Sequence, residues 1–571
     1  MLATATLVGI VLAHDVVGGL QSADSPYLRR SESSPIQWQP WGPAAFERSR
    51  RERKPVFISL GDFATYEPPR DESGRVNERA LALWLNENVV AVKVDRHERP
   101  DVAAVYEALP AARGAIPVAA LTNSDGVPIW SADRDPLSNE DVARQLRDAV
   151  AESLPGSKRP ATSERAPETR PESRLPEEPR GAALRARLME LQSLARDGAH
   201  VGPPALDLLL SDAAKAESRE APAVAARFLE TLARSPWRDA VAGGFHGRPG
   251  SDHMGFEKLL GVNALLIRLF AAAHVATDDL LFRQIAEETI DWALRDLRDT
   301  SGSFWSSVGA GTTAREGEYY VWTRAEIDRS LGAERAKEWW STYELRPPGV
   351  FALTGSPFAG VGGSRQVLLS RRNRRVRPSV DDTMLTGWNG LMIGALATSG
   401  QLLRRGSDVD AATRAATALL DRFPDPATLM RCTRGGRSYQ PALLEDYAYL
   451  IDGLTRLAAA QPHDARWRRA AMALADAAVL RFADRASGGF FETDGLDRCL
   501  PRRLPSTFDT HLPCAGATLA LALIRLGELT GEARYERIGR RAASAGHPPA
   551  RDHDRTDAFR LARSAAADAP R

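Results

Sequence analysis

Residues 54–69 read KPVFISLGDFATYEPP, and this stretch sets the fold of the N-terminal part of the chain. The run from Pro55 to Leu60 is apolar and rich in β-branched and aromatic side chains, a pattern typical of a buried strand. A second β-branched run occupies residues 89–94, and residues 78–88 before it show helical spacing. The sequence therefore predicts a strand, a helix and a central strand in succession.

The elements around this stretch predict an α/β domain over residues 23–153. Asn123-Ser124-Asp125-Gly126 separates two short apolar runs, which indicates a hairpin late in the domain. The remaining elements are helices at 44–53, 102–109 and 139–151 and the hairpin strands at 117–121 and 127–130. The resulting order, β-α-β-α-β-β-α, is that of the thioredoxin fold.

A helical domain is predicted over residues 182–545. Residues 154–181 before it are dense in Pro, Arg, Glu and Ser; such a segment cannot bury enough apolar area to fold, so we expect a disordered linker. Beyond it, amphipathic helices alternate with Gly- and aromatic-rich loops. Paired helices with loops gathered at one end predict an α/α toroid, whose loop face and central funnel would bind a ligand. Residues 546–571 are polar, and we expect a disordered tail.

The composition excludes several classes of partner. The 75 lysines and arginines nearly cancel the 74 aspartates and glutamates, so no global field attracts nucleic acid or an anionic membrane, and we expect neither as a partner. Cys432, Cys499 and Cys514 are widely spaced, without a C-x-x-C pair, and the ten histidines form no cluster with them. We therefore expect no disulfide framework, no bound metal and no cofactor.

The first 22 residues leave two alternatives open. Leu2 to Ala13 form a short apolar run that ends in a small residue, as in a signal peptide, but no Lys or Arg precedes it. The run is too short to span a bilayer, which takes about 20 residues. The alternatives are a weak export signal and a disordered start. We favour a soluble, cytoplasmic protein over an exported one.

Several blocks between Ser25 and Arg541 resemble the spermatogenesis-associated protein 20-like family of thioredoxin domain-containing proteins. The blocks are Ser25–Leu28, Trp38, Pro40–Gly42, Lys54–Phe57, Val92–Arg96 with Glu98–Asp101, Gly243–His246, Phe256–Lys258, Tyr320–Thr323, Asp381-Asp382, Leu385-Thr386, Trp388–Met392 and Asp446–Ala448. The resemblance implies a thioredoxin-like domain followed by a six-hairpin, glycosidase-like (α/α)6 toroid, and so a place in carbohydrate metabolism. It does not imply a defined reaction.

The chain departs from that family where the chemistry would lie. Thr65 and Pro68 stand at the two positions of the family's Cys-x-x-Cys, and neither can supply the thiolate that dithiol exchange needs. We therefore expect this domain not to be a dithiol oxidoreductase. An alternative that stays open is docking of a protein partner on the face that carries the Cys-x-x-Cys in the family. In the helical domain Gly255 replaces a family His and Thr383 replaces a family Lys, which suggests weakened or lost catalysis.

Polar residues in the toroid blocks are candidates for sugar chemistry, which needs a general acid and a general base. The candidate catalytic residues are Glu257, Asp381, Asp382 and Asp446, with His246 as a proton shuttle. The candidate ligand contacts are Phe245, Trp388, Asn389 and Tyr447. The competing interpretation is structural: Asp381 caps the helix start near Trp388, and Glu257 pairs with a neighbouring cation.

A basic cluster and the overall function each leave alternatives. Arg371, Arg372, Arg374, Arg375 and Arg377 would bind an acidic sugar or form a solvated loop, and we favour the loop. The first functional hypothesis is a degenerate, non-redox protein that binds a carbohydrate-like ligand or a protein partner. The second is a sugar epimerase, isomerase or glycoside hydrolase, and the third is an empty scaffold. Converging carboxylates would favour the enzyme, whereas carboxylates locked to arginines would favour binding or scaffolding.

Overall fold

The computed structural model describes residues 19–64, 78–107, 118–133, 136, 139–153, 182–196, 201–248, 255–311, 316–356, 360–545 and 556–567. The chain divides into two compact units. Unit 1 comprises residues 1–62, 71–168 and 497–501, and unit 2 comprises residues 63–70, 169–496 and 502–571. The predictions made for residues 1–18, Thr65, Pro68 and 154–181 lie outside the described residues.

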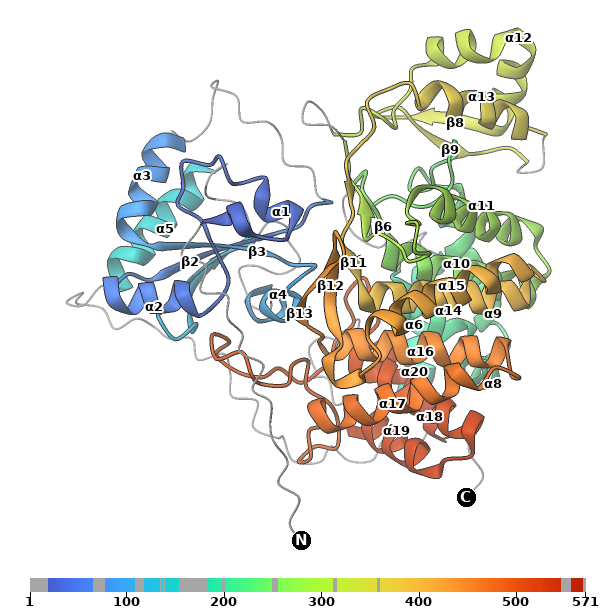
Figure 1. The fold of residues 1–571 in the computed structure, drawn as a ribbon. Coiled ribbons are helices and arrows are strands. Elements are labelled where there is room, and N and C mark those ends of the chain that lie inside the picture. The colour runs from blue at the N-terminus through green and yellow to red at the C-terminus, as the bar shows by residue number, and fades with distance from the viewer. Residues whose placement is uncertain are drawn as a thin grey trace. The chain divides into compact units, whose positions relative to one another are not determined.

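Unit 1 is built on a five-stranded sheet with the order β1-β3-β2-β4-β5 (Figure 1). The strands are β1 (Gln39–Pro40), β2 (Val56–Gly61), β3 (Val90–Asp95), β4 (Val118–Thr122) and β5 (Pro128–Ala132). The helices are α1 (Pro26–Arg29), α2 (Pro43–Glu52), α3 (Glu78–Asn88), α4 (Pro100–Glu107) and α5 (Glu140–Ser153). β1 and β2 run parallel to β3, whereas β4 is antiparallel to both β2 and β5. This is the thioredoxin topology, as predicted.

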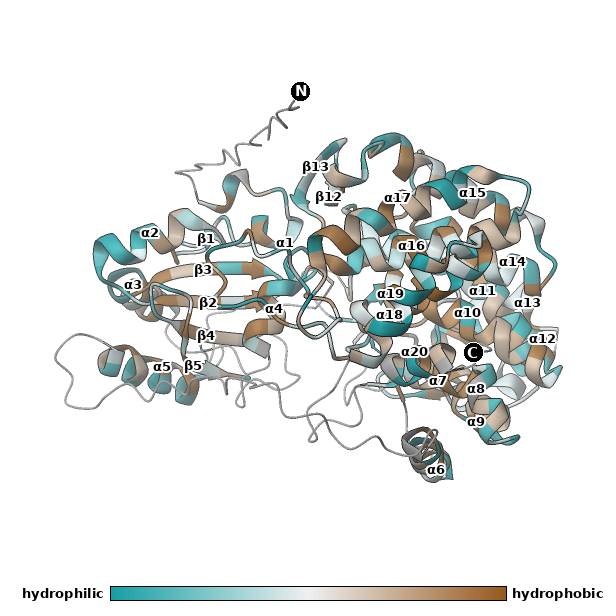
Figure 2. Cartoon of the chain, turned by 90° about the horizontal axis from the view of Figure 1, so that it is seen from below, coloured by the Kyte–Doolittle hydropathy of each residue, from teal (hydrophilic) through white to brown (hydrophobic). Residues whose placement is uncertain are grey.

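The centre of that sheet explains the two apolar runs in the sequence. Every residue of β2 and β3 is buried. Each strand has a neighbouring strand on both edges, and helices α1, α2 and α3 pack against the sheet (Figure 2). Val56 pairs with Val90, and Leu60 pairs with Val94. Strands buried on both faces are apolar throughout instead of alternating, so their sequences read as continuous β-branched runs.

Unit 2 contains a closed ring of helices. The ring helices are α7 (Pro203–Leu210), α10 (Leu260–Thr277), α14 (Thr386–Leu402), α16 (Leu444–Ala460), α18 (Ala515–Thr530) and α20 (Asp557–Ala567). Each of them packs against the next, and α20 packs against α7, so the ring closes. The other helices are α6 (Ala182–Arg196), α8 (Asp212–Glu217), α9 (Ala221–Arg234), α11 (Leu280–Asp296), α12 (Arg324–Thr342), α13 (Gly362–Arg372), α15 (Gly406–Arg422), α17 (Ala465–Phe482) and α19 (Ala533–Ala545). The predicted α/α toroid is confirmed.

Burial separates the ring helices from the outer ones. In α10 and α14 most residues are buried, because each packs against several other helices. In α15 the buried residues repeat at helical spacing on one face, as expected for an outer helix that covers the ring. Among the described residues, α10 is the one helix long and apolar enough to cross a membrane, and it is 67% buried inside the toroid.

The C-terminal tail corrects one prediction. Residues 557–567 form the last ring helix, α20, instead of a disordered tail. Ala558 and Ala562 are buried in the core of unit 2, and Asp557 accepts hydrogen bonds from Arg187 Nε (3.0 Å) and Nη2 (2.9 Å). The segment looks polar by composition, but its few apolar residues fall at helical spacing and fill the gap between α18 and α7.

Short strands gather where the ring helices begin. One sheet holds β6 (Lys258–Leu259), β7 (Ser307–Val308) and β10 (Val380–Asp381); a second holds β11 (Met384–Leu385), β12 (Met430–Arg434) and β13 (Arg437–Pro441); β8 (Tyr343–Arg346) pairs with β9 (Val350–Leu353). β6 leads directly into α10, and β11 leads directly into α14. The candidate residues therefore lie at the loop end of the toroid: Asp381 ends β10, Asp382 follows it, and Glu257 directly precedes β6.

Candidate functional site

Two Gly- and aromatic-rich loops are held by asparagines on the ring helices. Asn263, the fourth residue of α10, accepts a hydrogen bond from Phe245 N (2.7 Å) and donates to Phe245 O (3.1 Å). Asn389, the fourth residue of α14, does the same with Phe304 N (2.8 Å) and Phe304 O (2.9 Å). Asn389 is completely buried and also donates to the backbone, so its predicted role as a ligand contact is wrong.

The other aromatic candidates are also part of the core. Phe245 is completely buried and stacks on Phe270. Tyr447 is completely buried, and its hydroxyl donates to Pro426 O (2.6 Å) and accepts from Arg481 (3.0 Å). Trp388 is 2% exposed. The expectation that these rings stack on a sugar is therefore wrong in this structure, because their faces are covered by protein.

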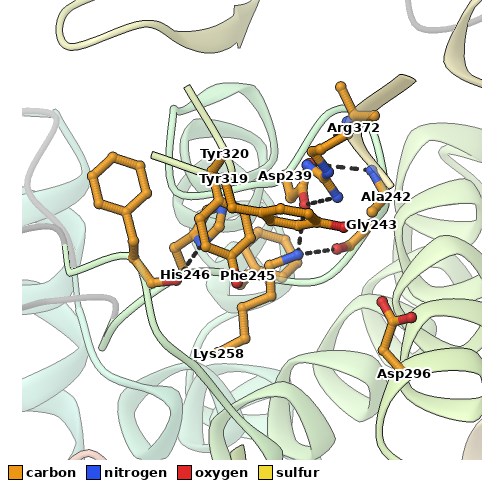
Figure 3. A network of polar contacts seen from close by, with 12 residues as sticks. Asp239, Ala242, Gly243, Phe245, His246, Lys258, Asp296, Tyr319, Tyr320 and Arg372 are labelled. Carbon is orange, nitrogen blue, oxygen red and sulfur yellow. Dashed lines mark hydrogen bonds and ion pairs between the residues drawn. The ribbon is translucent and has the colours of Figure 1, made fainter. Parts of the chain in front are cut away.

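A buried ion cluster lies behind the Gly243–His246 loop (Figure 3). Asp239 accepts parallel hydrogen bonds from Arg372 Nη1 and Nη2 (both 2.9 Å) and a third from Lys258 Nζ (2.7 Å). Lys258 also donates to Gly243 O (2.7 Å). Every member of this cluster is engaged by another, so the cluster fastens the loop to α13 and β6.

Burial and the charges of this cluster shift the pKa values of Asp239, Lys258 and His246. Burial by itself would raise the pKa of Asp239, but Arg372 and Lys258 hold it well below its usual range. Burial lowers the pKa of Lys258 to about 8, with Asp239 opposing the shift and Arg372 adding to it. Burial also lowers the pKa of His246 to about 3, and Lys258 adds to that effect.

His246 does not fit the predicted role of proton shuttle. Its Nδ1 lies 2.9 Å from Phe256 O, and its ring packs edge-on against Tyr320. Because the pKa of His246 is about 3, the imidazole is neutral at physiological pH and does not titrate there. A shuttle needs a pKa near the working pH, so the structure corrects this assignment.

Two of the four candidate carboxylates are paired with arginines. Asp446 is completely buried and accepts from Arg431 Nη1 (3.0 and 3.1 Å), Gly387 N (2.9 Å) and Leu443 N (3.0 Å). Asp382 accepts from Arg434 Nε (2.6 Å), and its side chain is 44% exposed. Asp446 thus joins β12 to the starts of α14 and α16. Its predicted catalytic role is replaced by a structural one.

The other two carboxylates belong to the β6-β7-β10 sheet. Asp381 is 3% exposed, and its carboxylate accepts from Thr383 N (3.0 Å). Burial raises the pKa of Asp381, while hydrogen bonds from Thr383 and Ser306 partly offset the shift. Glu257 is 6% exposed and lies over Gly255, where any added side chain would collide with its carboxylate. The glycine that replaces a family His therefore makes room for Glu257.

The register of this sheet aligns Asp381 with the central strand β7. Asp381 is paired with Ser307, and Ser307 is paired with Leu259. Glu257 lies directly before β6, two residues before Leu259. Ser307 Oγ is buried and has no hydrogen-bond partner within the described residues. We call Glu257, Ser307 and Asp381 the β7 face.

The basic cluster is only partly the solvated loop that we expect from the sequence. Arg371, Arg374 and Arg377 are exposed, in line with that expectation. Arg372 is instead buried against Asp239, and Arg375 donates to Val321 O (2.6 Å) and lies over the Trp322 ring. Spacing alone does not single out Arg372, because its partner lies 133 residues earlier in the chain.

The blocks of unit 1 form a structural cluster of their own. Ser25 Oγ donates to Asp95 Oδ2 (2.7 Å), and the ammonium group of Lys93 lies over the rings of Tyr27 and Trp38. Of the three cysteines, Cys499 belongs to unit 1; it is buried, and burial raises the pKa of its thiol to about 12. A thiol of that kind is not a nucleophile at neutral pH.

The described residues offer no evident place for a metal ion. Within them, no group of three or more His, Cys, Asp or Glu side chains is arranged to hold one.

The two residues before Thr65 are buried. These are Phe63 and Ala64, and Ala64 O accepts a hydrogen bond from Ala310 N (3.2 Å) inside unit 2.

Comparison with known proteins confirms the resemblance found in the sequence. Residues 18–154 match the family model Thioredox_DsbH, described as a protein of unknown function, DUF255. The chain is similar to spermatogenesis-associated protein 20 of Homo sapiens, with 28% identity over 89% of this chain and 75% of the relative. The Rattus norvegicus protein of that name is 27% identical over the same shares. The uncharacterized protein B0495.5 of Caenorhabditis elegans is 23% identical over 90% of this chain and 80% of its own.

Similar solved structures are carbohydrate enzymes. The GH76 α-mannanase BT2949 of Bacteroides thetaiotaomicron matches with a TM-score of 0.42 and 10% identity, over 67% of this chain and 95% of its own. The cellobiose 2-epimerase of Bacillus thermoamylovorans matches with a TM-score of 0.37 and 11% identity, over 56% and 69%. At such identities the activities of those enzymes say nothing about this chain.

Proposed function

We propose that this chain is a non-redox binding protein whose toroid holds a carbohydrate-like ligand at the loop end without turning it over. The observation that carries the proposal is the set of contacts made by the candidate acid and base residues. Asp382 and Asp446 are paired with arginines, and His246 is neutral at physiological pH. A carboxylate whose oxygen is engaged by an arginine is poorly placed to exchange a proton with a substrate, so this set is poorly suited to catalysis.

The β7 face is the proposed contact with the ligand. Ser307 Oγ lacks a partner within the described residues, and a buried hydroxyl left in that state costs about 1–3 kcal/mol. A ligand hydroxyl would satisfy it. The carboxyl oxygens of Asp381 would accept hydrogen bonds from the hydroxyl groups of a polyhydroxylated molecule.

A binding screen with matched variants tests this proposal. Isothermal titration with glucose, mannose, N-acetylglucosamine and cellobiose should find at least one that binds. Ser307→Ala and Asp381→Asn should each weaken that sugar about tenfold, the effect of losing one good hydrogen bond to a charged or buried partner. Asp382→Asn, on the exposed neighbour, is the control and should leave affinity unchanged. Equal affinity in all three variants, or no binding of any sugar, would contradict the proposal.

A second function, a sugar-modifying enzyme, is favoured by one feature of the same face. Asp381 is paired with β7 on one edge and Glu257 lies next to the strand on its other edge, and burial raises the pKa of Asp381. A protonated and an ionised carboxyl group form the usual acid and base pair for glycosyl chemistry. Proton NMR of the same sugars, incubated with the protein in heavy water, separates the two functions. New epimers or hydrolysis products that disappear in Asp381→Asn would establish the enzyme, and unchanged spectra with bound sugar would support the binding protein.

A further inference from the structure

A cavity opens at the end of the toroid away from the β7 face. It has a volume of about 470 Å³ and lies where α14, α16 and α18 end. Its polar lining residues are Thr398, Gln401, Thr455, Arg456, Arg525 and Glu528. All of them belong to unit 2 and to three successive ring helices. We call it the end cavity.

The end cavity connects to a charged core on the ring axis. A smaller cavity of about 40 Å³, lined by residues of all six ring helices, shares Arg456 and Arg525 with it. Around that axis Asp207 is bound by Arg268 (2.7 and 2.9 Å), and Asp452 is bound by both Arg456 (2.7 Å) and Arg525 (2.9 Å). Three arginines therefore face two aspartates, which leaves one positive charge without a partner among the groups that line the axis.

The two shared arginines keep donors free. Within the described residues, Arg456 uses only Nε, toward Asp452 Oδ2, and Arg525 uses only Nη1, toward Asp452 Oδ1. Their remaining N–H groups have no hydrogen-bond acceptor there. Burial lowers the pKa of Arg456 to about 10, with Asp452 opposing the shift and Arg525 and Arg268 adding to it. The nearby cations thus repel the charge on Arg456, and an anion would relieve that repulsion.

We propose that the end cavity binds a small hydroxylated anion, whose carboxylate or phosphate group contacts Arg456 and Arg525. A guanidinium group with free N–H donors is well suited to a planar or tetrahedral oxyanion. Thr398, Gln401 and Thr455 supply neutral partners for hydroxyl groups on the rest of the molecule. A sugar acid and a sugar phosphate share this chemistry.

A structural role for the two arginines is the alternative. In that interpretation the two arginines only neutralise the part-buried Asp452 and join α16 to α18. That role needs neither free donors nor a cavity, and it makes no demand on Glu528. This exposed carboxylate on the cavity rim should repel a bound anion, so its removal distinguishes the two interpretations.

Isothermal titration of the full chain with gluconate, glucose 6-phosphate, inorganic phosphate and neutral glucose tests the proposal. Gluconate or glucose 6-phosphate should bind, and the stronger of the two identifies the acidic group. Arg525→Gln, at a side chain 33% exposed, should weaken binding about tenfold, the effect of one lost charged hydrogen bond. Glu528→Gln should tighten binding of inorganic phosphate about threefold, because a like charge is removed.

Two control variants distinguish anion binding at the end cavity from sugar binding at the β7 face. Arg283→Gln, at a surface arginine on α11 with 41% exposure, should leave anion binding unchanged. Asp381→Asn should also leave it unchanged, so failure of the sugar proposal at the loop end does not decide this one. Absence of binding by every anion, or equal affinity in the wild-type chain and Arg525→Gln, would overturn the proposal.

Discussion

Asn263 and Asn389 make the same three hydrogen bonds at the starts of two ring helices. Each accepts from and donates to the backbone of a loop phenylalanine, and each also donates to the carbonyl four residues earlier, Leu259 O (2.9 Å) or Leu385 O (3.0 Å). The repeated arrangement shows how the toroid joins a ring helix to the loop that follows the neighbouring outer helix. The asparagines are therefore structural.

Replacement of either asparagine should destabilise unit 2. Asn263→Ala leaves one buried backbone N–H and two carbonyls without their partner, so we expect a loss of about 3 kcal/mol in the free energy of unfolding. Urea denaturation followed by circular dichroism measures it. Asn373→Ala, whose side chain contacts Tyr319 at a part-buried site, is the control and should cost less than about 1 kcal/mol. Unchanged stability with lost sugar binding in Asn389→Ala would restore the ligand-contact interpretation.

The pair between Arg372 and Asp239 should be a major source of stability. Arg372→Met leaves a buried carboxylate with fewer partners, and breaking such a pair from one side costs about 3–5 kcal/mol. The exposed neighbour Arg371→Met is a matched control, expected to stay within about 0.5 kcal/mol of the wild type. Guanidinium denaturation of both variants measures the difference. Equal costs at the two positions would show that the ion cluster is not stabilising.

His246 should make the protein less stable in acid. Its pKa is about 3 when folded, below the ordinary value of 6.5, so the unfolded chain binds a proton below pH 6.5 that the folded chain does not. The stabilising effect of the neutral imidazole is complete above pH 6.5 and is lost as pH falls toward 3. At pH 5 the loss relative to pH 7 should be about 2 kcal/mol.

Thermal unfolding across pH 4–7 checks this prediction through two variants. His246→Gln should flatten the decline of stability with acid, because position 246 then no longer titrates. His463→Gln, in an exposed loop, is the control and should keep the wild-type slope. An equal slope in wild type and His246→Gln would show that His246 does not carry the acid sensitivity.

The cysteines should be unreactive in the folded protein. All three are free and buried, and burial raises the pKa of the Cys499 thiol to about 12 from the ordinary 9.0. Its thiolate population near pH 8 is therefore about a thousandfold below that of an ordinary thiol. Titration with Ellman's reagent should find no fast-reacting thiol in the native state and three in urea. A fast native reaction would revive a redox role.

Local sequence predicted most of the architecture. The apolar runs at 55–60 and 89–94 correspond to β2 and β3, because a central strand buried on both faces has to be apolar throughout. The amphipathic spacing after residue 182 likewise predicted a helical domain, and α16 and α17 are two of its helices. The two-residue strands of the β6-β7-β10 sheet were not predicted, because a pair such as Val380-Asp381 is too short to show alternation of apolar and polar residues.

The sequence by itself determined the two fold classes and the absence of a dithiol in unit 1, because periodicity and residue identity are local properties. Only the tertiary structure decided which polar residues are available for ligands. Asp446 and Asp381 look alike along the chain and both are buried, yet Asp446 is paired with Arg431 whereas burial raises the pKa of Asp381. The partner of a charged group is chosen by strand register and helix packing, which join segments as distant as Asp239 and Arg372. Burial then sets its proton affinity, and no spacing in the sequence encodes either.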